Sequence, residues 1–195
     1  MRRAEISRTT KETAITLTLE LDGTGKGEIS TGCGFLDHML TLFAAHGKFN
    51  LSVKCKGDID VDYHHTVEDV GICLGQAFSR ALGDKRGIIR YGNMILPMDE
   101  ALILSAVDFS GRVFLVWDVE ISAQKVGNFD TELAEEFWRA FAGNAFCTMH
   151  FKKFSGSNAH HIIECAFKSM ARSIGQAVKI NAEFSDEIPS TKGVI

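Results

Sequence analysis

The sequence carries one short histidine motif twice, about half a chain apart. The motif is HHxxE, and it occurs in DYHHTVEDVGI at residues 62–72 and in NAHHIIECAFK at residues 158–168. Such a repeat indicates an internal duplication, which restricts the chain to folds that can be built from two similar halves. The two copies comprise His64, His65, Glu68, His160, His161 and Glu164.

The segments around the two motifs follow the same order: strand, strand, helix, strand and a long helix that opens at the motif. They cover residues 12–25, 25–34, 35–47, 49–57 and 64–82 in the first half, and 99–111, 112–121, 131–146, 147–156 and 160–179 in the second. The order predicts an α+β fold of duplicated ββαβα half-domains, with sheets packed against helices and a pseudo-twofold between the halves. We expect one domain with repeats at about 1–92 and 93–195, and Pro97 with the preceding Gly-Asn-Met in the crossing between them.

Composition and charge argue against several classes of protein. The net charge of −4 leaves no basic surface for nucleic acid. No apolar run approaches the roughly 18 residues of a membrane helix, and MRRAEISRTTKET lacks the apolar stretch of a secretory signal. The five cysteines are an odd number without a CxxC pair, and four lie in apolar stretches, which predicts reduced and mostly buried thiols. We therefore expect a cytoplasmic protein without nucleic-acid or membrane partners.

The HHxxE motif offers metal-binding side chains on one turn of helix. Residues three and four apart share a helix face, and imidazole with carboxylate suits Mn, Fe, Co, Ni or Zn. Aligning His64 with His160 places His38 within two residues of Glu136, so each half offers a similar set. The number of ligands suits two six-coordinate ions. The candidate ligands are His38, His64, His65, Glu68, Glu136, His160, His161 and Glu164.

Paired histidines also have simpler explanations. A single HH pair is usually a surface or helix-capping feature, but a helix start has no structural need for two such pairs at corresponding positions. Adjacent histidines on a helix point about 100° apart, so the two need not reach the same ion. This predicts sites shared between subunits and assembly that depends on metal. For His46, at a helix end, and His150, in a strand, we favour structural roles.

A second group of residues could bind a phosphate. The C-terminal EIPSTKGVI contains Ser190, Thr191 and Lys192, which offer hydroxyls and a cation. Arg90 and Arg112 stand in loops beside glycine turns. A solvated tail and ordinary surface charge are the simpler explanations. Lys168 is more informative, because it follows Glu164 by four residues and adds a cation to the proposed metal-binding face.

Taken together, five segments closely resemble the imidazoleglycerol-phosphate dehydratase family: GFLDHML, DYHHTVEDVGICLG, PMDEAL, NAHHIIECAFK and PSTKG. The resemblance covers essentially the whole chain and fits the monofunctional form. It implies a duplicated fold like domain 2 of ribosomal protein S5, with a four-stranded sheet and two helices in each half. It also implies two Mn²⁺ per active site with ligands from neighbouring subunits, and a homo-24-mer. It supports the same eight metal ligands, and the choice of Glu136 rests partly on it.

The resemblance also implies the reaction. It is the Mn-dependent dehydration of D-erythro-imidazoleglycerol phosphate to imidazoleacetol phosphate in L-histidine biosynthesis. The C2 proton is not next to a carbonyl, so a metal-bound imidazolate would act as electron sink and lead to a diazafulvene-like intermediate. Glu12 is the candidate general base, and Glu164 or a metal-bound water is its rival. The implied substrate contacts are Glu12, Arg90, Arg112, Lys168, Ser190, Thr191 and Lys192.

Two residues depart from the pattern of many family members. Glu136 stands where many members have histidine, and Leu42 stands where many have a glutamine that can hydrogen-bond. Two other functions remain open from the residues alone. One is a di-metal hydrolase that uses a bridging hydroxide, and the other is an assembly protein in which the ions only join subunits.

Overall fold

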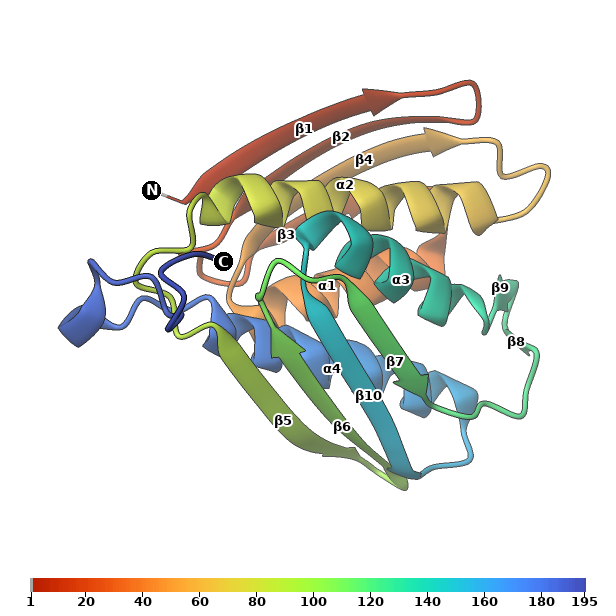
Figure 1. Cartoon of the computed structure of the whole chain (residues 1–195). Helices are drawn as coiled ribbons and strands as arrows, with labels where there is room; N and C mark the ends of the chain where they lie inside the picture. The colour runs from red at the N-terminus through yellow and green to blue at the C-terminus, as the bar shows by residue number, and fades with distance from the viewer. Residues whose placement is uncertain (1) are drawn as a thin grey trace.

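Two four-stranded sheets lie on either side of a layer of four helices in this computed structural model, which describes residues 2–195 (Figure 1). The first sheet has the order β1-β2-β4-β3, and the second has the order β5-β6-β10-β7. Helices α1 and α2 follow strands of the first sheet, and α3 and α4 follow strands of the second. The α+β fold with sheets packed against helices, predicted from the order of segments, is confirmed.

The elements of the first half are β1 (Arg3–Thr9), β2 (Thr13–Glu20), β3 (Gly27–Ser30), α1 (Gly34–Gly47), β4 (Asn50–Gly57) and α2 (His64–Leu82). Those of the second half are β5 (Tyr91–Met98), β6 (Ala101–Asp108), β7 (Phe114–Asp118), α3 (Leu133–Ala145), β10 (Thr148–Ser155) and α4 (Ala159–Ala177). The hairpin β8 (Lys125–Val126) and β9 (Phe129–Asp130) precedes α3, and a short 3-10 helix, Ala182–Phe184, lies in the tail.

The two sheets have the same pairing. In each, the first three strands in spatial order are antiparallel, and the fourth, β3 or β7, is parallel to its neighbour. Each half therefore begins with one strand more than the predicted ββαβα order. Both extra strands, β1 and β5, lie at sheet edges. The repeat boundaries at about 1–92 and 93–195 stay an interpretation, and Met1, at the start of the first, lies outside the described residues.

The predicted crossing at Gly92–Pro97 is wrong, because these residues belong to β5. Proline cannot donate to a strand ladder but is tolerated on an edge strand, and Pro97 occupies such an edge opposite Leu102. The sheets are connected instead by residues 83–90, between α2 and β5.

Apolar side chains fill the helix layer, and the backbones of α2 and α3 approach each other closely at two glycines. Phe43, Phe78 and Trp138 are fully buried in it. Gly71 and Gly75 of α2 let α3 come close, because a Cβ on either would lie 2.7 Å from Phe137 O or 2.6 Å from Phe141 O, respectively. The four helices start at one end of the molecule, where the β1–β2 and β5–β6 turns also lie, and the C-terminal tail lies at the other end (Figure 1).

Candidate metal centre and phosphate pocket

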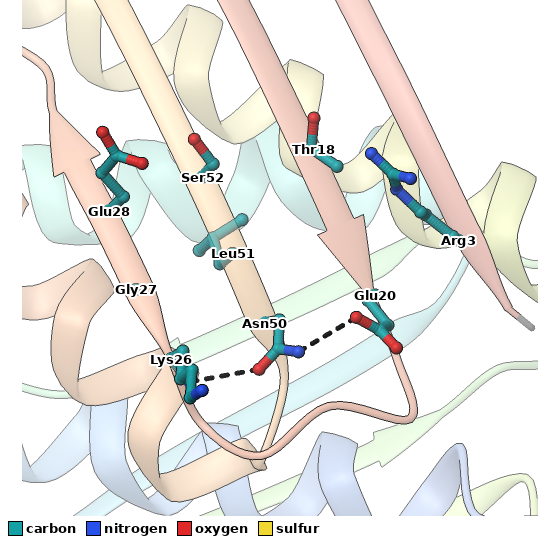
Figure 2. A pocket seen from close by; sticks show the side chains of 9 residues that line it. All are labelled: Arg3, Thr18, Glu20, Lys26, Gly27, Glu28, Asn50, Leu51 and Ser52. Carbon is teal, nitrogen blue, oxygen red and sulfur yellow. Dashed lines mark hydrogen bonds between the residues drawn. The ribbon is translucent and has the colours of Figure 1, made fainter.

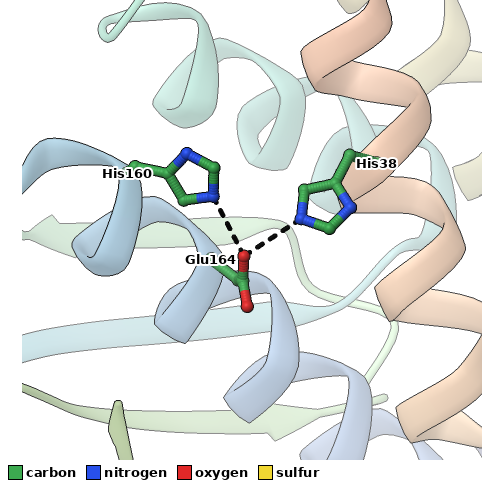
Figure 3. Close-up of side chains that lie close together, drawn as sticks. All are labelled: His38, His160 and Glu164. Atoms are coloured by element: carbon green, nitrogen blue, oxygen red, sulfur yellow. Dashed lines mark hydrogen bonds and ion pairs between the residues drawn. The ribbon is translucent and has the colours of Figure 1, made fainter. Parts of the chain in front are cut away.

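One group of metal-ligating side chains joins the two halves of the chain. His38 lies on α1, and His160 and Glu164 lie one turn apart on α4. Nε2 of His38 and Nε2 of His160 are each 3.1 Å from Oε2 of Glu164, so the carboxylate lies between two imidazoles (Figure 3). Within residues 2–195, these three are the residues whose ligand atoms lie within 4.8 Å of one another.

The start of α4 is held in place by its cap. Oδ1 of Asn158 accepts hydrogen bonds from the backbone N–H groups of His160, at 2.9 Å, and His161, at 3.3 Å. Such a cap satisfies amides that have no partner within the helix. The ring of Phe35 packs edge-on against that of His160, with centroids 5.2 Å apart. The cap therefore fixes the backbone at His160, and Phe35 contacts its ring.

Glu164 is only 6% exposed. Burial by itself raises the pKa of this carboxyl, but hydrogen bonds from Lys168, His38 and His160 outweigh burial, so that the pKa lies below its ordinary value. Lys168, predicted as a substrate contact, forms an ion pair with Oε1 of Glu164. The arrangement places two imidazole nitrogens and a carboxylate oxygen together, and these are ligand types that suit a first-row divalent cation.

The second histidine of each motif points to other acids. Nδ1 of His161 is 2.8 Å from Oε2 of Glu100, in the β5–β6 turn, and Nδ1 of His65 is 2.9 Å from Oδ2 of Asp58, between β4 and α2. Each of these hydrogen bonds raises the pKa of the histidine that makes it. Glu12, predicted as the base, lies here too, with Oε1 3.7 Å from Nε2 of His65.

The other predicted ligands lie outside the three-residue group. The backbone N–H of His64 donates to Asp62 Oδ1 at 2.7 Å. Glu136 lies on α3 with Oε1 3.5 Å from Arg139 Nε. Glu68 is half-buried on α2, one turn after His64. One chain therefore brings together His38, His160 and Glu164, and the assignment of the full eight-residue set stays a prediction.

Five of the predicted substrate contacts line one open pocket of about 360 Å³ at the other end of the molecule. They are Arg90, Arg112, Ser190, Thr191 and Lys192. Arg90 donates from Nε to Asp108 Oδ1 at 2.7 Å and from an Nη to Pro189 O at 2.8 Å, so it ties the tail to β6. The side chain of Arg112 is 69% exposed and lies 3.8 Å from Asp108, which leaves its guanidinium accessible to an anion.

The pocket and the histidines are separated by the length of a strand. Arg90 immediately precedes β5, whereas Asp99 and Glu100 immediately follow it. An eight-residue strand spans roughly 26 Å, and Figure 1 shows the tail and the helix starts at opposite ends. One small substrate cannot reach both places in a single chain.

A different pocket lies over β1 to β4 of the first sheet (Figure 2). There, Asn50 Nδ2 donates to Glu20 Oε2 at 2.9 Å, and the backbone N–H of Lys26 donates to Asn50 Oδ1 at 3.2 Å. None of the predicted site residues is among those lining it within residues 2–195, so we assign it no function.

The remaining residues of interest fall where packing explains them. Leu42 packs against the core. His46 lies in the last turn of α1, but burial, followed by Arg172, lowers its pKa, which disfavours the charged form that would suit the helix dipole. His150, by contrast, is an exposed residue of β10, so the structural role that we predicted for it is not supported by packing. All five cysteines are free and four are buried, as predicted.

Sequence reasoning missed three acids. Asp58, Glu100 and Asp108 contact His65, His161 and Arg90, respectively. A usable signal existed for the first two, because Asp58 shortly precedes the first HH pair and Glu100 stands in the PMDEAL segment. Asp108 at the end of a strand carried no comparable signal.

Comparison with known proteins identifies the family of this chain. The sequence profile of imidazoleglycerol-phosphate dehydratases matches residues 31–174. Curated proteins of that name from Xanthobacter autotrophicus and Azorhizobium caulinodans are 55% and 56% identical over 195 residues, covering 100% of this chain and 99% of each relative. The chain belongs to the imidazoleglycerol-phosphate dehydratase family.

Solved structures of family members share the fold. The imidazoleglycerol-phosphate dehydratase of Staphylococcus aureus superimposes with a TM-score of 0.84 at 41% identity, covering 92% of this chain and 99% of that one. The Pyrococcus furiosus enzyme, solved in complex with (S)-C348, gives 0.85 at 39% identity, covering 97% and 100%. The predicted membership is thus confirmed. None of the helices within residues 2–195 is long and apolar enough to cross a membrane.

Proposed function

We propose that this chain, a hydro-lyase of L-histidine biosynthesis, dehydrates D-erythro-imidazoleglycerol phosphate to imidazoleacetol phosphate with two Mn²⁺ per active site. The observation that carries the proposal is the buried Glu164 carboxylate between two imidazole nitrogens in a chain of this family. A cytoplasmic location belongs to the proposal and is supported by the free cysteines.

The residues fit the proposed metal. Two imidazole nitrogens and a carboxylate oxygen converge within 4.8 Å from two helices, and nitrogen with oxygen ligands suits first-row divalent ions, with the carboxylate favouring a hard ion such as Mn²⁺. When bound, the ions would act as Lewis acids on the imidazole ring of the substrate. His38, His160 and Glu164 would hold one ion, and the other five predicted ligands complete the proposed set.

The general base is proposed to be Glu12 and not Glu164. Both oxygens of Glu164 are engaged, Oε2 by the two imidazoles and Oε1 by Lys168. Glu12 has a side chain that is 52% exposed, and its Oε1 lies 3.7 Å from Nε2 of His65, beyond hydrogen-bond distance. Its carboxylate is thus the more available to take the C2 proton. In the proposed order, the C3 hydroxyl would leave first, with a proton, as water, which gives the diazafulvene-like stage. Transfer of the C2 proton to Glu12 would then give an enol, which tautomerises to the ketone.

The phosphate is proposed to bind Arg112, Ser190, Thr191 and Lys192, with Arg90 holding the tail. Binding energy from this remote group would orient the reacting carbons. Because the pocket and the histidines of one chain lie roughly a strand length apart, a second copy has to supply one of them. This separation supports the proposed self-association, for which the resemblance implies 24 subunits.

Removal and return of the metal tests the proposal. The protein is stripped with a chelator and reloaded with Mn²⁺, while turnover of imidazoleglycerol phosphate and mass in solution are followed together. We expect activity and a large assembly to return together. A large assembly that never turns over the substrate would favour ions that only join subunits, and phosphate-ester hydrolysis in place of dehydration would favour the di-metal hydrolase.

A further inference from the structure

The second histidines of the two motifs share one hydrogen-bond arrangement. His65 Nδ1 lies 2.9 Å from Asp58 Oδ2, and His161 Nδ1 lies 2.8 Å from Glu100 Oε2. An ionised carboxylate only accepts hydrogen bonds, so each Nδ1 carries the proton. In the neutral ring, the lone pair is then on Nε2, which is the atom left to bind an ion.

Neither Nε2 atom lies within hydrogen-bond distance of a carboxylate oxygen among residues 2–195. The closest carboxylate oxygens are Glu12 Oε1 at 3.7 Å from His65 Nε2 and Asp99 Oδ2 at 3.8 Å from His161 Nε2. These distances exceed that of a hydrogen bond. Each ring is therefore anchored at one nitrogen and available at the other.

The two carboxylates are themselves held. Oε1 of Glu100 accepts the backbone N–H groups of Ser157, at 3.2 Å, and Asn158, at 2.8 Å, which leaves Oε2 for His161. Asp58 is fixed through its backbone, since its N–H donates to Glu12 O at 3.1 Å. Its Oδ1 is buried without a hydrogen-bond partner among residues 2–195.

The two acids come from different places in the duplicated chain. Asp58 lies in the loop between β4 and α2, whereas Glu100 lies in the β5–β6 turn. The loop of the second half that corresponds to the first one, residues 156–158, contains no acid. The same contact thus arises from non-equivalent positions, which simple inheritance through duplication does not explain.

We propose that Asp58 and Glu100 are positioning residues, which hold His65 and His161 in the Nδ1–H tautomer and aim Nε2 at a metal ion. The inference rests on the proposed metal-dependent function. Acids that hydrogen-bond a metal-binding histidine fix its orientation and raise its basicity, and their loss typically weakens metal affinity by about 10–100-fold.

The test uses Glu100→Gln and Asp58→Asn in the full chain. In Glu100→Gln, the amide oxygen can keep the bonds to Ser157 and Asn158, while the amide N–H₂ faces His161 and demands an acceptor there. We expect long-range ¹H–¹⁵N spectra of the metal-free protein to show Nδ1–H at His65 and His161 in the wild type and a shift to Nε2–H in the variants. Titration with Mn²⁺, followed by electron paramagnetic resonance of the free ion, should show about 10–100-fold weaker binding.

Two matched variants control for charge. Asp60→Asn changes an exposed acid of the same loop as Asp58, and Glu28→Gln changes an exposed acid of β3. Both should bind Mn²⁺ as the wild type does. The inference would be overturned if the variants at Asp58 and Glu100 bind Mn²⁺ as the controls do. It would also be overturned if His65 and His161 carry the proton on Nε2 in the wild type. A wild type that binds no Mn²⁺ would overturn the proposed function and this inference with it. The wild-type spectrum tests the tautomer directly, even if a variant fails to fold.

Discussion

Glu164 connects more of the candidate site than any other residue in it. It is buried, it lies between histidines from two helices, and Lys168 pairs with its other oxygen. Replacing it with glutamine keeps the shape but removes the negative charge that a divalent ion would need.

We expect Glu164→Gln to lose Mn²⁺ affinity by about 100-fold or more, beyond the ~10–100-fold typical of residues that only orient a ligand. Turnover should fall at least as far, while the circular dichroism spectrum stays unchanged. Equilibrium dialysis against Mn²⁺ measures the first effect, with Glu28→Gln as the control. A variant with wild-type affinity would show that this carboxylate does not bind the ion.

A second prediction at the residue scale concerns pH. Hydrogen bonding from Arg2 lowers the pKa of Asp22 in the folded protein, so the pair stabilises the fold where Asp22 is ionised. That contribution is complete above the unfolded pKa of about 3.9 and is lost as pH falls through the lower, folded pKa.

Wild type should therefore exceed Asp22→Asn in free energy of unfolding at pH 7, by no more than about 1 kcal/mol for so exposed a pair. The difference should vanish once the pH is below the lowered, folded pKa of Asp22. Urea denaturation at pH 7 and below that pKa measures it. A difference that persists unchanged in acid would contradict the assigned pairing.

At the scale of elements, helix pairing decides how the two halves meet. The approach of α2 to α3 depends on Gly75, where a Cβ would lie 2.6 Å from Phe141 O and 2.8 Å from Asn144 Cβ. Alanine in a helix interior is ordinarily favoured over glycine by roughly 1 kcal/mol, so the close approach reverses the usual sign.

We expect Gly75→Ala to destabilise the protein by about 1–3 kcal/mol, the usual range for overpacking. Gly143→Ala on α3 is the matched control, since within the described residues no neighbouring atom lies within 4 Å of its Cβ position. It should be neutral or stabilising, by up to about 1 kcal/mol. Thermal and urea unfolding compare the two. Equal effects would show that the α2–α3 contact is not as close as described.

The edge strands show where pattern reading falls short. In β1, only Ala4 and Ile6 are buried, among charged neighbours, and β5 contains Gly92 and Pro97. Neither segment has the apolar alternation that identifies β2 or β6, because an edge strand needs partners on one side only. The helices were predictable because apolar residues recur every three or four positions within each continuous segment.

At the scale of the whole molecule, the candidate metal ligands and the candidate phosphate pocket lie far apart. The histidines lie at the helix starts and the tail pocket lies at the opposite end (Figure 1). If a neighbouring copy supplies the missing part, a chain that is defective at one end can still serve a site with its intact end.

We therefore expect complementation between Glu164→Gln and Lys192→Ala. Each variant alone should be nearly inactive, and metal-dependent reassembly of a mixture should restore part of the turnover. A mixture of Glu164→Gln with His38→Ala is the control, because both changes damage the same end and no complete site can form. Recovery in neither mixture, with assembly intact, would indicate that each chain carries its own complete site.

Local sequence determined much of this protein: the duplication, the positions of the four main helices, the burial of the cysteines, and the family, through short segments whose residues are adjacent in the chain. It also named the residue types of a metal site and of a phosphate site. Only the tertiary structure decided which of them meet. His38 and Glu164 are 126 positions apart, and the acids beside His65 and His161 come from non-equivalent loops. Contacts of that kind follow from the packing of sheets and helices, which no local pattern encodes. The same packing places the histidines and the tail pocket about one strand length apart.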